Sequence, residues 1–248
     1  MGDLDVGKMR YERQMRISGW GESGQSDLAN ASLLVAGVGG LGCTSANLLA
    51  RAGVGHLLLA DSETVGEPDL NRQILYGEDD VGRSKAEIAR LRLSGINHEP
   101  RIEAFEDEIS EGTVDSLLEG IDGVVDGLDN FGTRYLLNDR CFRAGIPFFH
   151  GSVFGFEGRA STFVPGRSPC LRCLYPSAQE EDLLPIAGPV PSVVGSIQAL
   201  EAIKYLLRMP DLLTGRLLLF DGEDLTCSEV EIQSRPNCPV CAQPHSTA

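Results

Sequence analysis

The stretch LLVAGVGGLGC (33–43) combines a short apolar run with glycines at G-x-G-x-x-G spacing and a further glycine after the second one. The apolar run is typical of a buried strand, and LGCTSANLLARAG (41–53) continues as a helix that ends at glycine. A glycine turn between a strand and a helix is where nucleotide phosphates contact a helix amino terminus. We expect Gly37 to allow the tight turn, and Gly39 and Gly40 to let a phosphate approach the backbone.

The next predicted strand, HLLLAD (56–61), ends in Asp61, 19 residues after Gly42. A carboxylate at this position accepts hydrogen bonds from ribose hydroxyls in dinucleotide-binding proteins. Taken alone, the glycine turn and this acid favour NAD as the ligand. The alternatives are ATP and a glycine turn that serves packing only.

Charge and composition narrow the class of protein. The chain has 248 residues, a formal net charge of −15 and seven cysteines. A strongly acidic chain is a poor match for nucleic acid or an anionic membrane, so we expect neither partner. The polar amino terminus and the lack of a long apolar run predict a cytoplasmic protein. In that reducing compartment the cysteines are expected to be metal ligands, nucleophiles or core residues.

The predicted elements change character near residue 150. Strands alternate with helices over 1–150, which predicts a parallel sheet and a nucleotide-binding half. Residues 151–248 show hairpin-like strand pairs and one strong amphipathic helix, VVGSIQALEAIKYLLRM. We therefore expect one α/β domain over 1–248, with a Rossmann-like parallel half continued by an antiparallel half in one mixed sheet. A crossover loop is expected at 176–191.

Two C-x-x-C pairs predict a structural metal site. Cys170 and Cys173 form one pair, and Cys238 and Cys241 form the other. Four thiolates are a closed tetrahedral set for zinc, with no open position for catalysis. The alternative is a pair of redox dithiols, but each pair lies in a Pro-rich turn and not ahead of a predicted helix. We expect the zinc to tether the carboxyl-terminal tail to the middle of the chain.

Two cations are expected over the glycine turn. Arg72 lies in the irregular segment after the second strand, and Lys85 lies in the first turn of a predicted helix, 83–97. In a βαβ unit both can point toward the carboxyl edge of the sheet. Two cations there suit a triphosphate better than a nicotinamide ring. The alternative is that both are solvated surface charges.

The segment DGLDN (126–130) supplies acids after a third predicted strand, GVVDGLDN (123–130). We expect Asp129 at the end of this strand to hold a magnesium ion that bridges phosphate oxygens. Asn130 is expected to cap the helix that follows, because Asn and Asp favour that position.

With these features placed, the sequence resembles the ThiF/MoeB/HesA family, the bacterial relatives of ubiquitin-activating enzymes. The resemblance runs nearly end to end. It is carried by RYERQ (10–14), GVGGLGC (37–43), AGVGHLLLAD (52–61), LNRQ (70–73), GRSKAE (82–87), the LDN of DGLDN, PCLRCL, GSIQALEAIKYL and both C-x-x-C pairs.

The resemblance implies an adenylyltransferase that uses ATP and Mg²⁺ to activate the terminal glycine of a small ubiquitin-like sulfur-carrier protein ending in Gly-Gly. It also implies a homodimer and a structural Zn²⁺. Gly40 and its neighbours would contact the nucleotide, and Asp61 would hold the ribose. Residues 68–72, which include Asp69, Asn71 and Arg72, would line the phosphate site. Lys85 would contact phosphates, Asp129 would hold magnesium, Asn130 would take part in cofactor binding, and Arg13 would reach the ATP of the other subunit.

One position departs from the family pattern. Several members have a cysteine in the crossover loop, and Leu184 occupies the matching place here. Of the remaining cysteines, Cys43, Cys141 and Cys227 are each expected to be buried apolar residues and not nucleophiles. We therefore expect adenylation without an obligatory covalent intermediate on the enzyme. We also expect a separate sulfur donor, because the chain stops soon after Cys241 without a rhodanese-like extension.

Two other functions stay open at this point. A non-catalytic scaffold that binds a carrier would also account for the missing cysteine. An NAD-dependent oxidoreductase would account for the glycine turn and Asp61, but no hydride-transfer motif accompanies them.

Overall fold

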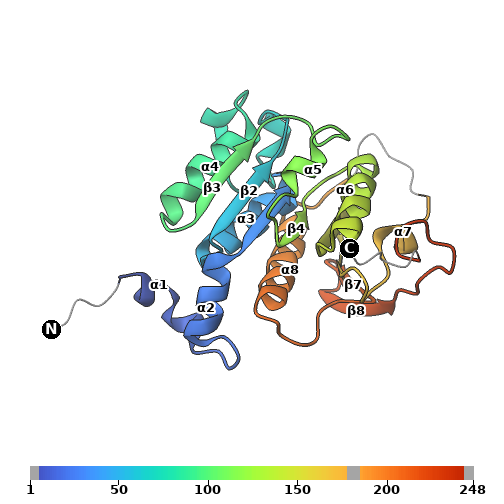
Figure 1. Ribbon diagram of the computed structural model, residues 1–248. Coiled ribbons are helices and arrows are strands. Elements are labelled where there is room, and N and C mark those ends of the chain that lie inside the picture. Colours follow the sequence, from blue (N-terminus) through green and yellow to red (C-terminus); the bar gives the residue numbers. More distant parts are fainter. Residues whose placement is uncertain (1–5, 178–184, 243–248) are drawn as a thin grey trace.

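The protein is described by a computed structural model that covers residues 6–177 and 185–242 (Figure 1). One eight-stranded sheet has the order β3-β2-β1-β4-β5-β6-β7-β8. The first five strands are parallel, and β6, β7 and β8 are antiparallel to their neighbours. The strands are β1 (Ser32–Ala36), β2 (His56–Ala60), β3 (Arg101–Phe105), β4 (Gly123–Asp126), β5 (Phe148–Phe154), β6 (Glu157–Phe163), β7 (Arg216–Asp221) and β8 (Thr226–Glu231). The predicted mixed sheet is confirmed.

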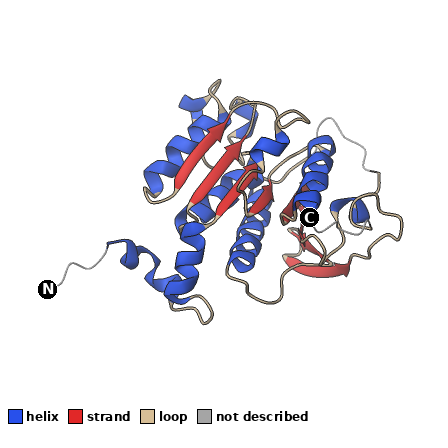
Figure 2. Cartoon of the chain, viewed as in Figure 1, coloured by secondary structure: helices blue, strands red, loops and turns tan. Residues whose placement is uncertain are grey.

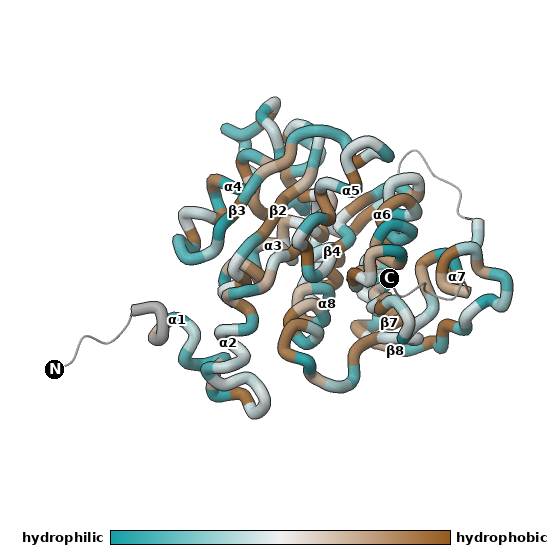
Figure 3. Tube along the Cα trace, viewed as in Figure 1, coloured by the Kyte–Doolittle hydropathy of each residue, from teal (hydrophilic) through white to brown (hydrophobic). Residues whose placement is uncertain are grey.

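The parallel strands are buried on both faces. Leu33 and Val35 of β1 belong to one apolar cluster, and Leu34 and Ala36 belong to another. This is why the segment reads as a continuous apolar run and not as an alternating one. Figure 3 shows the hydrophobic colour concentrated on the central strands and on α8, with hydrophilic loops around them.

Helices cover both faces of the sheet, as Figure 2 shows. One face carries α2 (Gly21–Asn30), α3 (Gly40–Ala52), α4 (Lys85–Ile96) and α8 (Pro189–Leu206). The other carries α5 (Val114–Leu117), α6 (Phe131–Ala144) and α7 (Leu171–Leu174). The helix α1 (Val6–Met15) lies beside α2, at the end of the molecule from which β1 and β2 start (Figure 1). Within the described residues, no helix is long and apolar enough to cross a membrane.

Several local predictions need correction. The strand expected over 123–130 ends at Asp126, because the Asp126 carboxylate accepts the Leu128 N–H and turns the chain away. The first strand of the hairpin expected after residue 150 begins before that boundary, because β5 runs continuously from Phe148 to Phe154. The helix α2 was not predicted. The crossover-loop position Leu184 lies outside the described residues.

The order of the strands creates a crevice at the carboxyl ends of β1, β2 and β4. The chain leaves β1 toward β2 on one side and later returns to pair β4 on the other. The loops after β1 and β4 therefore diverge at this point, which is where open α/β sheets bind ligands. Two short 3₁₀ helices, η1 (Glu67–Asp69) and η2 (Glu78–Asp80), fill the irregular segment after β2.

Candidate nucleotide site and metal centre

The glycine turn forms one wall of a cavity of about 610 Å³ at this crevice. Gly37 has a φ of +82°, and a side chain there would meet the Gly127 carbonyl oxygen at 2.7 Å. The loops after β1 and β4 can approach this closely only with glycine at the contact. The helix α3 begins at Gly40, and both Gly39 and Gly40 line the cavity. The predicted phosphate-binding turn therefore opens into a real cavity.

Asp61 lies at the end of β2 and lines the same cavity. Its two carboxylate oxygens accept the N–H groups of Val38 at 2.7 Å and Glu63 at 2.9 Å. Burial raises the pKa of Asp61, although both backbone hydrogen bonds and the charge of Lys85 act in the other direction. The carboxylate is thus held rigidly against the glycine turn.

Asp69 joins the two predicted cations. Lys85, the first residue of α4 and only 5% exposed at its side chain, places Nζ 2.6 Å from Glu63 Oε2 and 3.2 Å from Asp69 Oδ2. The Arg72 guanidinium lies 3.4 Å from Asp69 Oδ1. Burial lowers the pKa of Lys85, but the hydrogen bond to Glu63 and the charges of Asp61 and its neighbours outweigh it and raise the pKa. Lys85 therefore stays charged, and both Lys85 and Arg72 line the cavity.

The loop after β4, which carries Asp129, forms a further part of the cavity wall. Asp129 is exposed and lines the cavity beside Asn130, whose side chain caps α6 by accepting the Thr133 N–H at 2.8 Å. The predicted cap is confirmed. Asp129 does not end the strand as expected, since it follows the turn made by Asp126. Hard oxygen ligands on this wall fit a magnesium ion, which prefers a few carboxylates together with phosphate oxygens.

Two predicted residues do not line the cavity in the single chain. Asn71 is exposed, and its side chain accepts a hydrogen bond from Arg72 at 3.1 Å. Arg13 is exposed on α1, at the end of the sheet opposite the crevice. The structure therefore brings together Gly37, Gly39, Gly40, Asp61, Asp69, Arg72, Lys85, Asp129 and Asn130.

A buried ion network under this wall was not predicted. Arg134 on α6 contacts Asp126 at 3.1 Å and donates to the Gly151 carbonyl at 3.0 Å and to the Leu128 carbonyl. His150 Nδ1 lies 2.7 Å from Asp126 Oδ2, and both residues are fully buried. Arg134 thus fixes the loop 127–130 to β5. In the sequence, Asp126 ends a strand and Arg134 follows eight residues later. Hydrophobic periodicity does not reveal that these two side chains pair.

The antiparallel half closes the far end of the cavity. Ser152, Val153 and Phe154 of β5, Arg159 of β6, Tyr175 and Ile186 line it there. These residues were not singled out from the sequence. The cavity is therefore lined by both halves of the chain.

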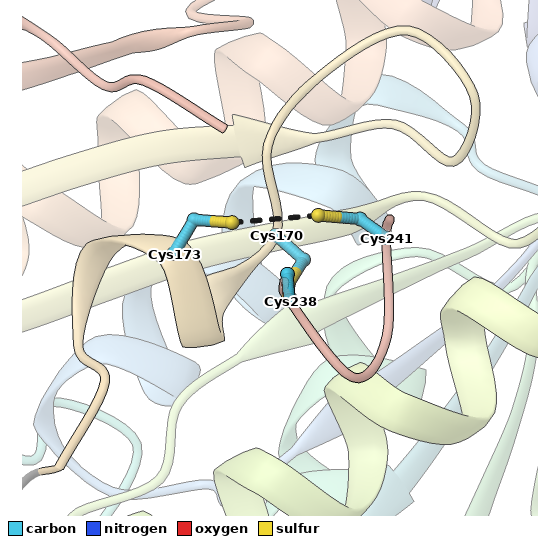
Figure 4. Close-up of side chains that lie close together, drawn as sticks. All are labelled: Cys170, Cys173, Cys238 and Cys241. Atoms are coloured by element: carbon cyan, nitrogen blue, oxygen red, sulfur yellow. Dashed lines mark hydrogen bonds between the residues drawn. The ribbon is translucent and has the colours of Figure 1, made fainter. Parts of the chain in front are cut away.

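The four paired cysteines converge as predicted (Figure 4). Their Sγ atoms all lie within 4.8 Å of one another. The close contacts run between the pairs, at 3.4 Å for Cys170 with Cys238 and 3.4 Å for Cys173 with Cys241. Zinc with sulfur ligands at about 2.3 Å separates those sulfurs by roughly 3.8 Å, so the set fits that ion. One expectation is wrong: Cys170 immediately precedes the short helix α7 and Cys173 lies within it, so this pair does not lie in a plain turn.

The other three cysteines differ in exposure. Cys43 and Cys141 are fully buried as predicted, and burial raises the pKa of Cys43 to about 12. Cys227 is exposed, which corrects the prediction of a buried residue. Its strand β8 is at the edge of the sheet, and all six of its residues are exposed, because no element among the described residues covers it.

The fold is Rossmann-like, with a cavity at the carboxyl ends of its parallel strands. The chain belongs to the ThiF family, whose family model matches residues 11–240. The predicted family is thereby confirmed.

Known relatives agree with this assignment. The chain is 42% identical to the SAMP-activating enzyme E1 of Haloferax volcanii over 240 residues, which are 94% of this chain and 88% of that protein. It is 40% identical to the adenylyltransferase and sulfurtransferase MOCS3 of Drosophila sechellia over 243 residues, 95% of this chain, but spans only 54% of MOCS3. The solved structure of E. coli MccB with MccA-N7isoASN superposes with a TM-score of 0.85 at 23% identity, covering 95% of this chain and 75% of that one. At that identity the likeness supports the fold alone.

Proposed function

We propose that this protein adenylates the carboxyl-terminal glycine of a small ubiquitin-like sulfur-carrier protein with ATP and releases pyrophosphate. The observation that carries the proposal is one cavity lined by the glycine turn, Asp61, Arg72, Lys85 and Asp129. The names of the relatives support it, since one is a SAMP-activating enzyme E1 and others are adenylyltransferases.

The chemistry needs alignment more than a strong base. The carrier's terminal carboxylate is already ionised at neutral pH. Its oxygen forms a bond to the α-phosphorus, the bond from that phosphorus to the bridging oxygen breaks, and pyrophosphate leaves with the electron pair. Arg72 and Lys85 would neutralise charge that moves to the leaving group. Asp129 would hold Mg²⁺, which supplies further charge neutralisation at the phosphate oxygens when bound.

The two ends of the cavity match the two substrates. ATP would lie against Gly39, Gly40 and Asp61, with its phosphates toward Arg72 and Lys85. The carrier tail would enter from the end lined by Val153, Phe154 and Tyr175. We further propose a cytoplasmic homodimer in which Arg13 reaches the partner's ATP, and a separate sulfur donor that attacks the acyl-adenylate.

The test is carrier-dependent exchange of labelled pyrophosphate into ATP, measured with candidate carriers that end in Gly-Gly. We expect Asp129→Ala to abolish exchange and to leave the circular dichroism spectrum and melting temperature nearly unchanged, because Asp129 is exposed. Asp224→Ala removes an exposed acid in the turn between β7 and β8 and should keep full exchange. A fully active Asp129→Ala protein would refute the metal role.

The same assay separates the alternatives. A carrier that binds without any exchange would favour the scaffold. Binding of NAD in preference to ATP and Mg²⁺ would favour an oxidoreductase. The cations at the glycine turn argue against that last outcome, since a nicotinamide ring needs an uncharged pocket.

A further inference from the structure

Tyr76 places its hydroxyl group on the backbone of the glycine turn. The hydroxyl oxygen lies 2.8 Å from the Val38 carbonyl oxygen and 3.1 Å from the Lys85 carbonyl oxygen. A phenol has one proton to donate, so the shorter contact makes Val38 the main acceptor. Tyr76 is 8% exposed and does not line the cavity. Any effect of this hydroxyl on a bound ligand must therefore pass through the backbone that it holds.

The backbone of Val38 is held at both of its polar groups. Its N–H donates to Asp61 Oδ2 at 2.7 Å. Its carbonyl oxygen accepts the Tyr76 hydroxyl and also the thiol of Cys43, a weaker donor, at 3.1 Å. Val38 and Cys43 are fully buried, and both hydrogen bonds to this carbonyl are buried as well. The Val38 carbonyl therefore points into the core.

The peptide bond between Val38 and Gly39 turns this contact into a direction for the Gly39 N–H. The bond is trans, so its carbonyl and its N–H point in opposite directions. With the carbonyl held in the core, the N–H points away from the core, and Gly39 is partly exposed and lines the cavity. No group in the described part of the chain accepts a hydrogen bond from this N–H. It is therefore available to an anion in the cavity.

The glycine at position 39 makes such a hold necessary. Gly39 has a φ of −82°, but a glycine adopts positive φ values at little cost. Without the hydrogen bonds to Val38, the peptide unit between the two residues could rotate and exchange the directions of its carbonyl and its N–H. The rotated unit would present an oxygen atom to the cavity, and that oxygen would repel a phosphate.

We propose that Tyr76 is a positioning residue that keeps the Gly39 N–H directed at the phosphates of the bound nucleotide. Its hydroxyl holds the Val38 carbonyl in the core and so excludes the rotated peptide. The same hydroxyl lies against the carbonyl of Lys85, so it also keeps the glycine turn beside the amino end of α4. This inference rests on the proposed use of ATP.

The variant Tyr76→Phe tests the proposal, because it removes the hydroxyl and keeps the ring. We would measure dissociation constants of the full-length protein for ATP, in excess Mg²⁺, and for adenosine by titration calorimetry. The dissociation constant for ATP should rise about fivefold, since fewer molecules direct the N–H at the phosphates. The value for adenosine, which has no phosphate, should stay within about twofold. The ratio of the two constants is the readout, because a general loss of stability would not change it.

Ser161→Ala is the matched control. The Ser161 hydroxyl lies 2.8 Å from the Arg216 carbonyl oxygen and 3.3 Å from the Leu213 carbonyl oxygen. Ser161 is 2% exposed and does not line the cavity. This variant also removes a buried hydroxyl that faces two carbonyl oxygens, so the ratio of the two dissociation constants should keep its wild-type value.

The wild-type protein provides a second measurement that does not depend on a folded variant of Tyr76. In protein labelled with ¹⁵N-glycine, the amide resonance of Gly39 can be assigned by its absence from the spectrum of Gly39→Ala. We expect this resonance to shift when ATP and Mg²⁺ bind and to move little with adenosine, because only the phosphates accept this N–H.

Two results would overturn the proposal. One is a Tyr76→Phe protein with the wild-type ratio of dissociation constants. The other is a wild-type protein in which bound ATP leaves the Gly39 resonance in place. A wild-type protein that binds no ATP would instead refute the proposed function, and this inference with it.

Discussion

At the scale of single residues, the carboxylates of Glu63 and Asp69 pair with the cations of the cavity. A triphosphate bound to these cations would have to displace the carboxylates. Lys85 is nearly buried, yet its partner Glu63 is 65% exposed at its side chain. An exposed ion pair contributes about 0–1 kcal/mol, so it keeps Lys85 oriented without holding it strongly. The surrounding acids keep Lys85 charged in a chain whose net charge is −15.

Removing this competing carboxylate should strengthen nucleotide binding. We expect Glu63→Gln to lower the dissociation constant for ATP by up to about fivefold at low ionic strength, with a smaller gain in high salt. Titration calorimetry at two salt concentrations would measure it. Glu67→Gln changes an exposed acid that does not line the cavity and should have no effect. Weaker binding by Glu63→Gln would mean that Glu63 itself contacts the ligand.

The buried pair of His150 and Asp126 makes stability depend on pH. Burial lowers the pKa of His150 below the reference value of 6.5, although the hydrogen bond to Asp126 acts in the opposite direction. Below pH 6.5 the unfolded chain therefore binds a proton that the folded chain does not. Stability from this group is full above about pH 6.5 and is lost as the pH falls toward the folded pKa.

We expect the free energy of unfolding to fall between pH 7.5 and 5.5, by at most about 1.4 kcal/mol per pH unit from this histidine. Urea denaturation at several pH values measures the slope. His150→Gln should flatten the curve in this range, and His98→Gln, at an exposed position, should not. An equal slope in the wild-type and His150→Gln proteins would contradict the assignment.

At the scale of elements, the cysteine cluster joins the carboxyl-terminal tail to α7. Arg235 N–H also donates to Cys173 Sγ at 3.4 Å, which adds a backbone hydrogen bond to a sulfur ligand. Burial raises the pKa of Cys170, so its thiol keeps its proton without a metal, and binding of zinc would release that proton. The cysteine cluster therefore cross-links two segments, 170–173 and 238–241, that lie far apart in the sequence.

Loss of one ligand should release the tail. We expect Cys238→Ser to reduce bound zinc from about one equivalent to near zero and to lower the melting temperature by about 5–15 °C, as for the loss of a cross-link. Metal analysis and calorimetry measure both. Cys227→Ser, at the exposed cysteine of β8, should retain zinc and stability. A Cys238→Ser protein that keeps its zinc would show that other ligands bind it.

At the scale of the whole molecule, Arg13 lies outside the cavity of its own chain. It is exposed on α1, at the end of the sheet away from the crevice (Figure 1). In the proposed homodimer this helix would instead reach the partner's site, and an arginine is suited to bind phosphate there. The question of which chain supplies Arg13 can be answered with mixed dimers.

Differently tagged Arg13→Ala and Asp129→Ala chains can be co-expressed and purified as the heterodimer. If Arg13 acts across the interface, one of the two sites is intact, and pyrophosphate exchange should reach about half the wild-type rate. Both homodimers should be nearly inactive. A heterodimer as inactive as the homodimers would mean that Arg13 acts within its own chain, or that no such dimer forms.

Much of the site could be predicted because it lies in short local motifs. A strand, a glycine turn and a helix follow one another in the chain, so Gly37 to Gly40 and Asp61 could be placed without tertiary contacts. The failures came from contacts between distant segments. The turn made by Asp126 moved Asp129 off its strand, and the uncovered edge strand β8 left Cys227 exposed where alternation predicted burial.

The sequence by itself determined the mixed sheet, the glycine turn with its acid, the helix cap at Asn130 and the pairing of four cysteines, because each depends on spacing along the chain. Only the tertiary structure decided that Arg72 and Lys85 meet at Asp69 and that Arg134 and His150 enclose Asp126. These follow from burial and from the directions of side chains on separate elements, which the order of residues does not encode locally.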